Sequence, residues 1–118
     1  MSNIKVSVIV PVFNASQYIS NTLSSIISQD FDSFEIIVVD DGSTDNSLEI
    51  INDSLNDCKI PHKIIHQTNQ GVSVARNKGI QASCGDYLVF VDADDNVSSN
   101  HLDCLYNGET DFSLVQFV

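Results

Sequence analysis

The chain has 118 residues, of which 42% are hydrophobic and 18% charged, a composition typical of one globular domain or part of one. Sixteen acidic residues face five basic ones, and the resulting net charge of −11 argues against nucleic acid and anionic lipid as direct partners. The cysteines (Cys58, Cys84 and Cys104) match no zinc or redox spacing, and the N-terminus lacks a signal-peptide pattern. We therefore expect reduced thiols and a cytoplasmic protein.

Short apolar runs alternate with helical patterns along the chain. Residues 6–10 are rich in β-branched side chains and stop at Pro11, which predicts a buried strand. Helices are predicted where apolar residues recur every three or four positions, with Ser43 or Thr44 as the N-cap of the second. In chain order, the predicted elements are strand 6–10, helix 18–27, strand 35–39, a helix ending near 55, strand 63–66, helix 72–82, strand 87–91, a short helix ending near 105, and strand 112–118.

This alternation predicts an α/β fold of Rossmann-like type, with a mostly parallel sheet and helices on both faces. The nearly continuous apolar strands agree, because parallel strands are buried on both sides. Ligands of such sheets bind at the carboxyl ends of the strands. The residues that follow each predicted strand are therefore the first candidates for a functional site.

Polar clusters occupy these positions. Residues 11–14 follow the first strand, residues 40–43 the second and residues 92–95 the fourth, while the helix after the third strand carries 71–79. Each cluster also has a simpler structural interpretation. Asp40 and Asp41 could be turn or cap residues with Gly42 at positive φ, Asn14 could cap the first helix, and Arg76 and Asn77 could lie on an exposed helix face.

The run Asp92-Ala93-Asp94-Asp95 predicts a metal site. Three carboxylates within four residues repel one another, and a divalent cation removes that repulsion. Magnesium and manganese prefer oxygen ligands, often carboxylates together with substrate phosphates. We expect Mn²⁺ or Mg²⁺ here.

Four segments together resemble the inverting family 2 glycosyltransferases, which have the GT-A fold. They are VSVIVPVFN at 6–14, IIVVDDGSTD at 36–45, NQGVSVARNKG at 69–79 and GDYLVFVDADD at 85–95, in that order. Each segment alone is a weak signal, whereas four in register are specific.

The resemblance implies a role for each matching position. Pro11, Val12, Phe13 and Asn14 would line the nucleoside pocket. Asp40 would accept a hydrogen bond from the base, commonly uracil, with Asp41 close by. The remaining implied donor and metal positions are Arg76 and Asn77 at the donor, Asp92 and Ala93 at the ribose end of the Asp-x-Asp motif, and Asp94 on the metal with Asp92 and Asp95 assisting.

The implied reaction transfers a sugar, most commonly from a UDP-sugar, to an acceptor hydroxyl with inversion and with a divalent metal. The acceptor of the full-length enzyme would be a saccharide or a lipid-linked sugar of polysaccharide or cell-envelope synthesis, and that enzyme could sit at the inner face of the membrane. The resemblance also implies a C-terminally truncated chain. Residues 1–118 match the donor-binding part, and the acceptor-binding part with the catalytic base would lie beyond Val118.

Alternatives remain open from the sequence. A haloacid-dehalogenase-type phosphatase also places Asp-x-Asp after an apolar strand, but Asn96 stands where Thr or Val is expected. A calcium loop at 92–103 would need Gly at Val97, and a receiver domain would need its acidic pair after the first strand. A non-catalytic nucleotide-binding or oligomerising fragment of the same fold is the fourth alternative. Its apolar segment 112–118 could pair between two chains in a homodimer.

Overall fold

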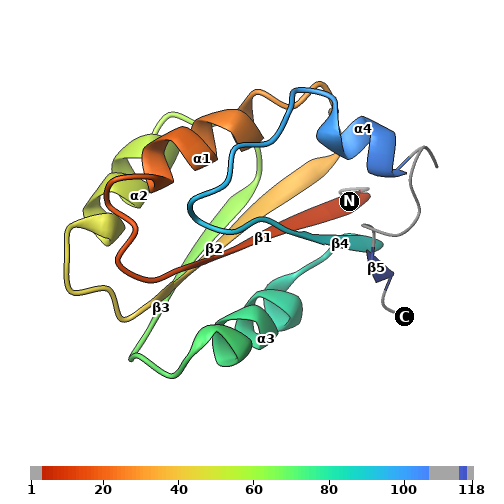
Figure 1. The fold of residues 1–118 in the computed structure, drawn as a ribbon. Coiled ribbons are helices and arrows are strands. Elements are labelled where there is room, and N and C mark those ends of the chain that lie inside the picture. The colour runs from red at the N-terminus through yellow and green to blue at the C-terminus, as the bar shows by residue number, and fades with distance from the viewer. Residues whose placement is uncertain (1–3, 107–114, 117–118) are drawn as a thin grey trace.

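The computed structural model describes residues 4–106 and 115–116. Figure 1 shows one twisted sheet with helices on both faces. The elements are β1 (Val6–Val12), α1 (Ile19–Ile27), β2 (Phe34–Asp41), α2 (Ser47–Leu55), β3 (His62–Gln67), α3 (Val72–Ala82), β4 (Tyr87–Phe90), α4 (His101–Tyr106) and β5 (Val115–Gln116).

The sheet has the order β3-β2-β1-β4-β5, in which β1, β2, β3 and β4 run parallel and β5 pairs antiparallel with β4. This confirms the predicted α/β class and the mostly parallel sheet. The chain moves outward from β1 to β3 and then returns to place β4 on the other side of β1. The carboxyl ends of β1 and β4 therefore form the topological switch point, where ligands bind in open α/β sheets.

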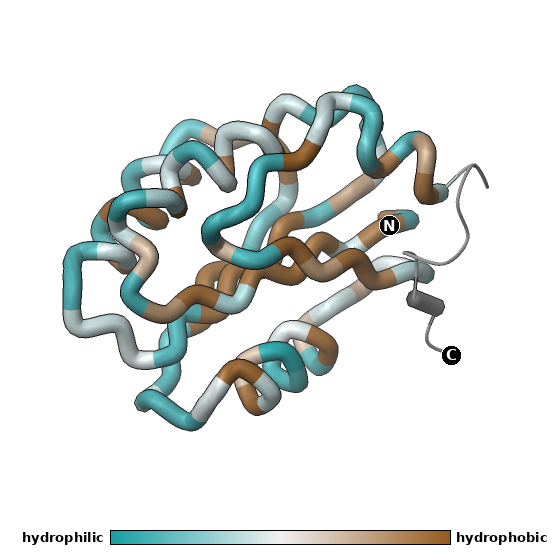
Figure 2. The backbone as a smooth tube through the Cα atoms, viewed as in Figure 1, coloured by the Kyte–Doolittle hydropathy of each residue, from teal (hydrophilic) through white to brown (hydrophobic). Residues whose placement is uncertain are grey.

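Alternate residues of each strand face opposite layers. In β1, Val8 and Val10 pack in the core under α1, α2 and α4, whereas Ile9 packs against the α3 layer. Helix α3 presents a face of small residues, Ala75 and Gly79, to that second layer. Figure 2 shows the resulting pattern, with hydrophobic strands in the middle and hydrophilic loops around them.

Strand β1 continues through Pro11, so the prediction that it ends at this proline was wrong. Proline lacks a backbone N–H and is normally excluded from central strands. Here the amide of Val91 donates to the carbonyl of Ile9, so Ile9 and Pro11 both turn their backbone groups toward β4. Because β4 ends at Phe90, no ladder bond is lost at Pro11.

Helix α2 begins at Ser47 with Asn46 as its N-cap residue, so the prediction that Ser43 or Thr44 caps it was wrong. The hydroxyl of Ser43 instead donates to the carboxylate of Asp40.

Of the predicted strand 112–118, the described part is Val115–Gln116, which pairs with β4 of the same chain. The remainder lies outside the described residues, and the homodimer stays a prediction.

Candidate functional site

A first cavity of about 240 Å³ lies at the carboxyl ends of β1 and β2, beside the start of α3. Its walls are largely apolar, with two polar side chains among them. The lining residues are Pro11, Val12, Phe13, Asp41, Asn69, Gly71, Val72 and Ala75. Three of the predicted donor-binding positions, at 11–13, therefore meet Asp41 in one hollow.

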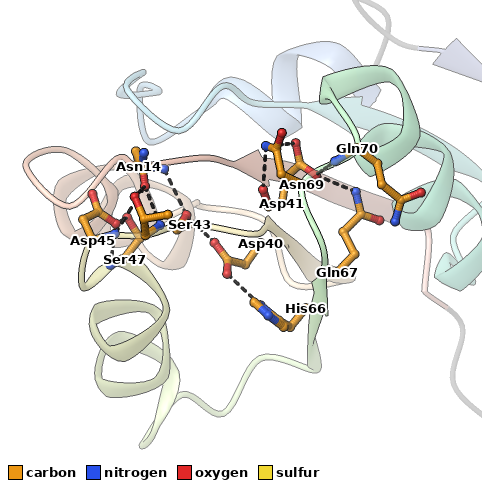
Figure 3. Close-up of polar contacts among 11 residues, drawn as sticks. Asn14, Asp40, Asp41, Ser43, Asp45, Ser47, His66, Gln67, Asn69 and Gln70 are labelled. Atoms are coloured by element: carbon orange, nitrogen blue, oxygen red, sulfur yellow. Dashed lines mark hydrogen bonds and ion pairs between the residues drawn. The ribbon is translucent and has the colours of Figure 1, made fainter.

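Asp41 is a buried carboxylate, 4% exposed, at the floor of this cavity. Its Oδ1 accepts from Nε2 of Gln67 and the amide of Gln70, both at 2.8 Å. Its Oδ2 accepts from Nδ2 of Asn69 at 3.2 Å and the amide of Gly71 at 3.0 Å. Figure 3 shows Gln67 at the end of β3 and Asn69 and Gln70 in the loop that follows it, all directed toward Asp41.

These bonds decide the charge of Asp41. Burial alone raises the pKa of this carboxyl, but the hydrogen bonds from Gln67, Gln70 and Gly71 outweigh it and hold the pKa below 3.8, the usual value. Asp41 is therefore ionised at neutral pH, and it fixes loop 67–71 as a wall of the first cavity.

Two glycines permit this arrangement. Gly42 follows Asp41 at φ 72°, and a Cβ there would meet the backbone nitrogen of Asn69 at 2.6 Å. Gly71 adopts φ 101° as the N-cap residue of α3 while its amide donates to Asp41. Both φ values lie in the region that favours glycine. The predicted positive φ at Gly42 is thus confirmed.

Asp40 does not line the first cavity. It is 0% exposed, and its carboxylate accepts from Nδ1 of His66 at 2.8 Å and from the hydroxyl of Ser43. Consecutive residues of a strand point to opposite faces, so Asp40 faces the α2 side when Asp41 faces the α3 side. The expected contact between Asp40 and a base is not supported by this geometry, and Asp41 is the better placed carboxylate.

A second cavity of about 270 Å³ adjoins the first and shares Pro11, Phe13 and Val72 with it. It lies at the switch point between β1 and β4. The other lining residues are Asn14, Ala15, Tyr18, Asp92, Ala93 and Asp94. The predicted positions of strand one and of the Asp-x-Asp motif therefore lie side by side.

Residues 92–95, here called the acidic loop, bring three carboxylates together. One oxygen each of Asp92, Asp94 and Asp95 lies within 4.8 Å of the others, and all three side chains are exposed. The amide of Asp95 donates to the carbonyl of Asp92 at 3.0 Å, which closes a tight turn. Three hard oxygen donors open to solvent suit a divalent cation that keeps positions for water or phosphate.

Arg76 reaches the acidic loop from α3. Its Nη2 lies 3.6 Å from Oδ1 of Asp92, and the guanidinium lies 5.9 Å from the ring centre of Phe90. Asn77 is exposed and lines neither cavity. It stands two positions after the buried Ala75, about 200° around the helix, which turns it away from the sheet. The expectation that Asn77 faces the pocket is not supported.

The acidic loop is held in place by Thr22 of α1, a contact that was not predicted from the sequence. Oγ1 of Thr22 donates to the carbonyl of Ala93 at 2.8 Å, and Oγ of Ser25 accepts from the amide of Val97 at 3.2 Å. Further along, Nε2 of Gln29 donates to the carbonyl of Ser98 at 2.6 Å. The available signal was the spacing 22, 25 and 29, which places polar residues at helical intervals beside the apolar face.

Replacing Thr22 by valine tests this support. Thr22 is 1% exposed, so valine keeps the shape and removes the hydroxyl that holds the Ala93 carbonyl. We expect a loss of about 1 kcal/mol in the free energy of unfolding and weaker Mn²⁺ binding, measured by denaturation and by calorimetry. Ser20→Ala, on the exposed side of α1, is the control. Unchanged stability and metal affinity in Thr22→Val would contradict the role.

Large apolar side chains are exposed at these cavities. Among the described residues, Phe13 (50%), Tyr18 (52%) and Val72 (50%) are the exposed large hydrophobic residues, and all three line the second cavity. Exposed apolar surface that gathers around a concave site is typical of ligand binding. Phe13 was predicted from the sequence as a site residue, whereas Tyr18 and Val72 were not.

Known proteins resemble this chain in sequence. Residues 7–108 match the family model described as glycosyl transferase family 2. An Escherichia coli protein named uncharacterized glycosyltransferase YibD is 47% identical over 94 residues, which are 79% of this chain and 27% of that protein. Glycosyltransferase GlyA of Streptococcus pneumoniae is 42% identical and aligns with 86% of this chain and 14% of its own length. The chain thus spans about a quarter or less of these relatives.

Solved structures are similar too. TarS 1-349 of S. aureus in complex with UDP superposes with a TM-score of 0.80 at 35% identity, covering 88% of this chain and 31% of that one. The mannosyltransferase PcManGT of Pyrobaculum calidifontis in complex with GDP-Man and Mn²⁺ gives 0.75 at 29% identity, covering 78% and 28%. These neighbours confirm the GT-A fold.

The family match also decides against the phosphatase, calcium-loop and receiver alternatives. Within residues 4–106, no helix has the length and apolar character that crossing a membrane would require. The matched segment includes both cavities and the acidic loop. The chain belongs to glycosyl transferase family 2.

Proposed function

We propose that residues 1–118 form the donor side of a metal-dependent glycosyltransferase, which binds the nucleoside and diphosphate of a nucleotide sugar. One observation carries this proposal. Two adjoining cavities share Phe13 and Val72 at the switch point, and one is apolar around an ionised Asp41 while the other contains the acidic loop. A nucleotide sugar has the matching pair of ends, a flat base that donates hydrogen bonds and a charged diphosphate.

The first cavity suits the base. Phe13 and Val72 offer apolar surface to its ring, and a ring N–H would bond to Asp41 in place of its longest donor, Nδ2 of Asn69 at 3.2 Å. We assign this contact to Asp41 rather than Asp40, because Asp40 is fully buried on the other side of β2. Uracil is the proposed base. Its support is the similarity to TarS with UDP and to TarS with UDP-GlcNAc, at TM-scores of 0.80 and 0.81.

The second cavity suits the diphosphate once a cation is present. The chain carries a net charge of −11, and two carboxylates line this cavity, so a bare diphosphate would be repelled. Asp94 would hold Mn²⁺ or Mg²⁺, with Asp92 and Asp95 beside it, because these residues supply clustered, exposed oxygen donors. When bound, such an ion neutralises charge on the diphosphate leaving group.

Residues of this chain would orient the donor. Arg76 spans from the Phe90 ring to Asp92 and keeps that carboxylate directed toward the cavity. Thr22 fixes the carbonyl of Ala93 and with it the turn that presents Asp94. The proposed reaction is transfer of the sugar to an acceptor hydroxyl with inversion at the sugar carbon. The acceptor class we propose is a saccharide or a lipid-linked sugar.

A nucleotide panel tests the proposal. Calorimetric titrations of this chain with UDP, GDP and CDP, each with Mn²⁺, should show the tightest binding for UDP. Uridine alone should bind more weakly than UDP, because it leaves the second cavity empty. Equal affinity for UDP and uridine in the presence of Mn²⁺ would contradict a diphosphate site at the acidic loop. A preference for GDP would contradict the choice of base while leaving the donor site in place.

A further inference from the structure

The proposed function gives no role to the buried carboxylate of Asp40. Asp40 is 0% exposed, yet it touches neither cavity. A buried carboxylate is costly unless hydrogen bonds compensate for lost hydration. Asp40 has two such partners, Nδ1 of His66 at 2.8 Å and the hydroxyl of Ser43.

The bond to Asp40 fixes the direction of the next one. A carboxylate accepts and does not donate, so the single hydroxyl proton of Ser43 points to Asp40. The lone pairs of the Ser43 oxygen are then free to accept, and the backbone amide of Asn14 donates to this oxygen at 2.9 Å. Figure 3 shows the resulting chain of side chains from His66 through Asp40 and Ser43 to Asn14.

Asn14 needs such support because its backbone is unusual. Its φ is 50°, the left-handed region that non-glycine residues rarely adopt, although asparagine tolerates it better than most. Its side-chain Oδ1 accepts from the amide of Thr44 at 2.7 Å and from the amide of Asp45 at 3.3 Å. Backbone and side chain of Asn14 are thus both tied to the loop that follows β2.

The next two residues are tied in the same way. The amide of Ala15 donates to Oγ of Ser47 at 2.9 Å, and the amide of Ser16 donates to Oδ2 of Asp45 at 3.2 Å. The backbone amides of residues 14, 15 and 16 therefore all donate hydrogen bonds to side chains of residues 43–47. Asn14 and Ala15 in turn line the second cavity beside Asp92 and Asp94. The loop after β2 therefore sets the position of one wall of that cavity.

We infer that Asp40 is a positioning residue of the donor site. Through Ser43 it holds Asn14 in the left-handed conformation and so shapes the wall that faces the acidic loop. This inference rests on the proposed function for its ligand, but its structural part does not need a ligand. It gives the two adjacent aspartates different tasks, Asp41 at the nucleoside and Asp40 at the diphosphate side.

The first test uses the free protein. Ser43 is half-buried at a loop, so Ser43→Ala removes the hydroxyl with little change in packing. We expect the Asn14 amide to exchange with solvent about tenfold faster in this variant, measured by NMR. Ser43→Thr keeps the hydroxyl and should keep the protection, and Ser24→Ala on the exposed face of α1 is the control. Unchanged exchange at Asn14 in Ser43→Ala would overturn the inference.

The second test separates the two ends of the ligand. With Mg²⁺ present, Ser43→Ala should bind UDP about fivefold more weakly than the native chain, whereas uridine binding should be unchanged. Ser43→Thr should restore UDP binding. Equal weakening for uridine and UDP would contradict a role confined to the diphosphate side. If the native chain bound neither ligand, the proposed function would fail, and the exchange measurement would still decide whether the Ser43 hydroxyl that is bonded to Asp40 positions Asn14.

Discussion

Asp94→Ala should lower the affinity of the chain for UDP in the presence of Mn²⁺ by roughly a hundredfold, to the value measured without metal. Asp94 is exposed, lines the second cavity and belongs to the cluster of carboxylates whose oxygens lie within 4.8 Å of one another. Asp92 shares these properties. Loss of residues that merely orient metal ligands costs about 10–100-fold in metal affinity. Loss of a direct ligand should reach the upper end of that range.

The matched control for this variant is Asp86→Ala. Asp86 is an exposed aspartate that precedes β4, so its removal changes the net charge equally at the other end of that strand. Both variants should melt within a few degrees of the native chain, because neither side chain is buried. If Asp94→Ala kept the full effect of Mn²⁺ on UDP binding, the metal assignment would be wrong.

Asp41→Asn should lower the free energy of unfolding by about 3 kcal/mol and greatly weaken uridine binding. The four donors around Asp41 were arranged for a carboxylate. An amide turns its own N–H₂ toward two of them and leaves part-buried donors such as those of Asn69 and Gly71 without acceptors, at about 1–3 kcal/mol each. Chemical denaturation measures the first effect and NMR titration with uridine the second.

The pH dependence of stability provides a second test of Asp41→Asn. The folded pKa of Asp41 is lowered below 3.8, so its contribution to stability is present above that pH and is lost as the pH falls through the folded value. The native chain should therefore lose stability below about pH 4 more steeply than Asp41→Asn. Identical acid unfolding of the two proteins would contradict an ionised, hydrogen-bonded Asp41.

Asp40→Asn is the control for the nucleoside contact. It alters an equally buried aspartate one position earlier, on the opposite face of β2. We expect uridine binding to persist in Asp40→Asn and to fall in Asp41→Asn. The reverse result would return the base contact to Asp40, as the sequence resemblance first implied.

The order of the elements followed from the sequence because apolar runs and helical spacing are local signals. Their ends were harder to predict. Pro11 continues β1 since its neighbour β4 has already ended, which is a tertiary fact. Ser43 does not cap α2, because its hydroxyl donates to the buried Asp40 and its oxygen accepts from the amide of Asn14. In both cases a contact distant in sequence overrides a local preference.

The candidate site was predictable in its outline and not in its details. The motifs placed the acidic loop and residues 11–14 correctly at the carboxyl ends of the strands. Which of Asp40 and Asp41 lines the first cavity depends on the face of β2 that each side chain occupies. These faces are known only once the register of the sheet is known. The bond from Thr22 to Ala93 joins residues 71 apart in the sequence, and the helical spacing of Thr22 does not reveal which distant carbonyl it contacts.

A crystal structure of this chain with UDP and Mn²⁺, with the ion located by its anomalous signal, would show whether the two cavities bind the base and the metal-bound diphosphate. We expect manganese bound by Asp94 at the acidic loop, and the uracil ring in the first cavity with a ring N–H on Asp41. Manganese elsewhere on the acidic surface, or a uracil ring outside the first cavity, would contradict this assignment.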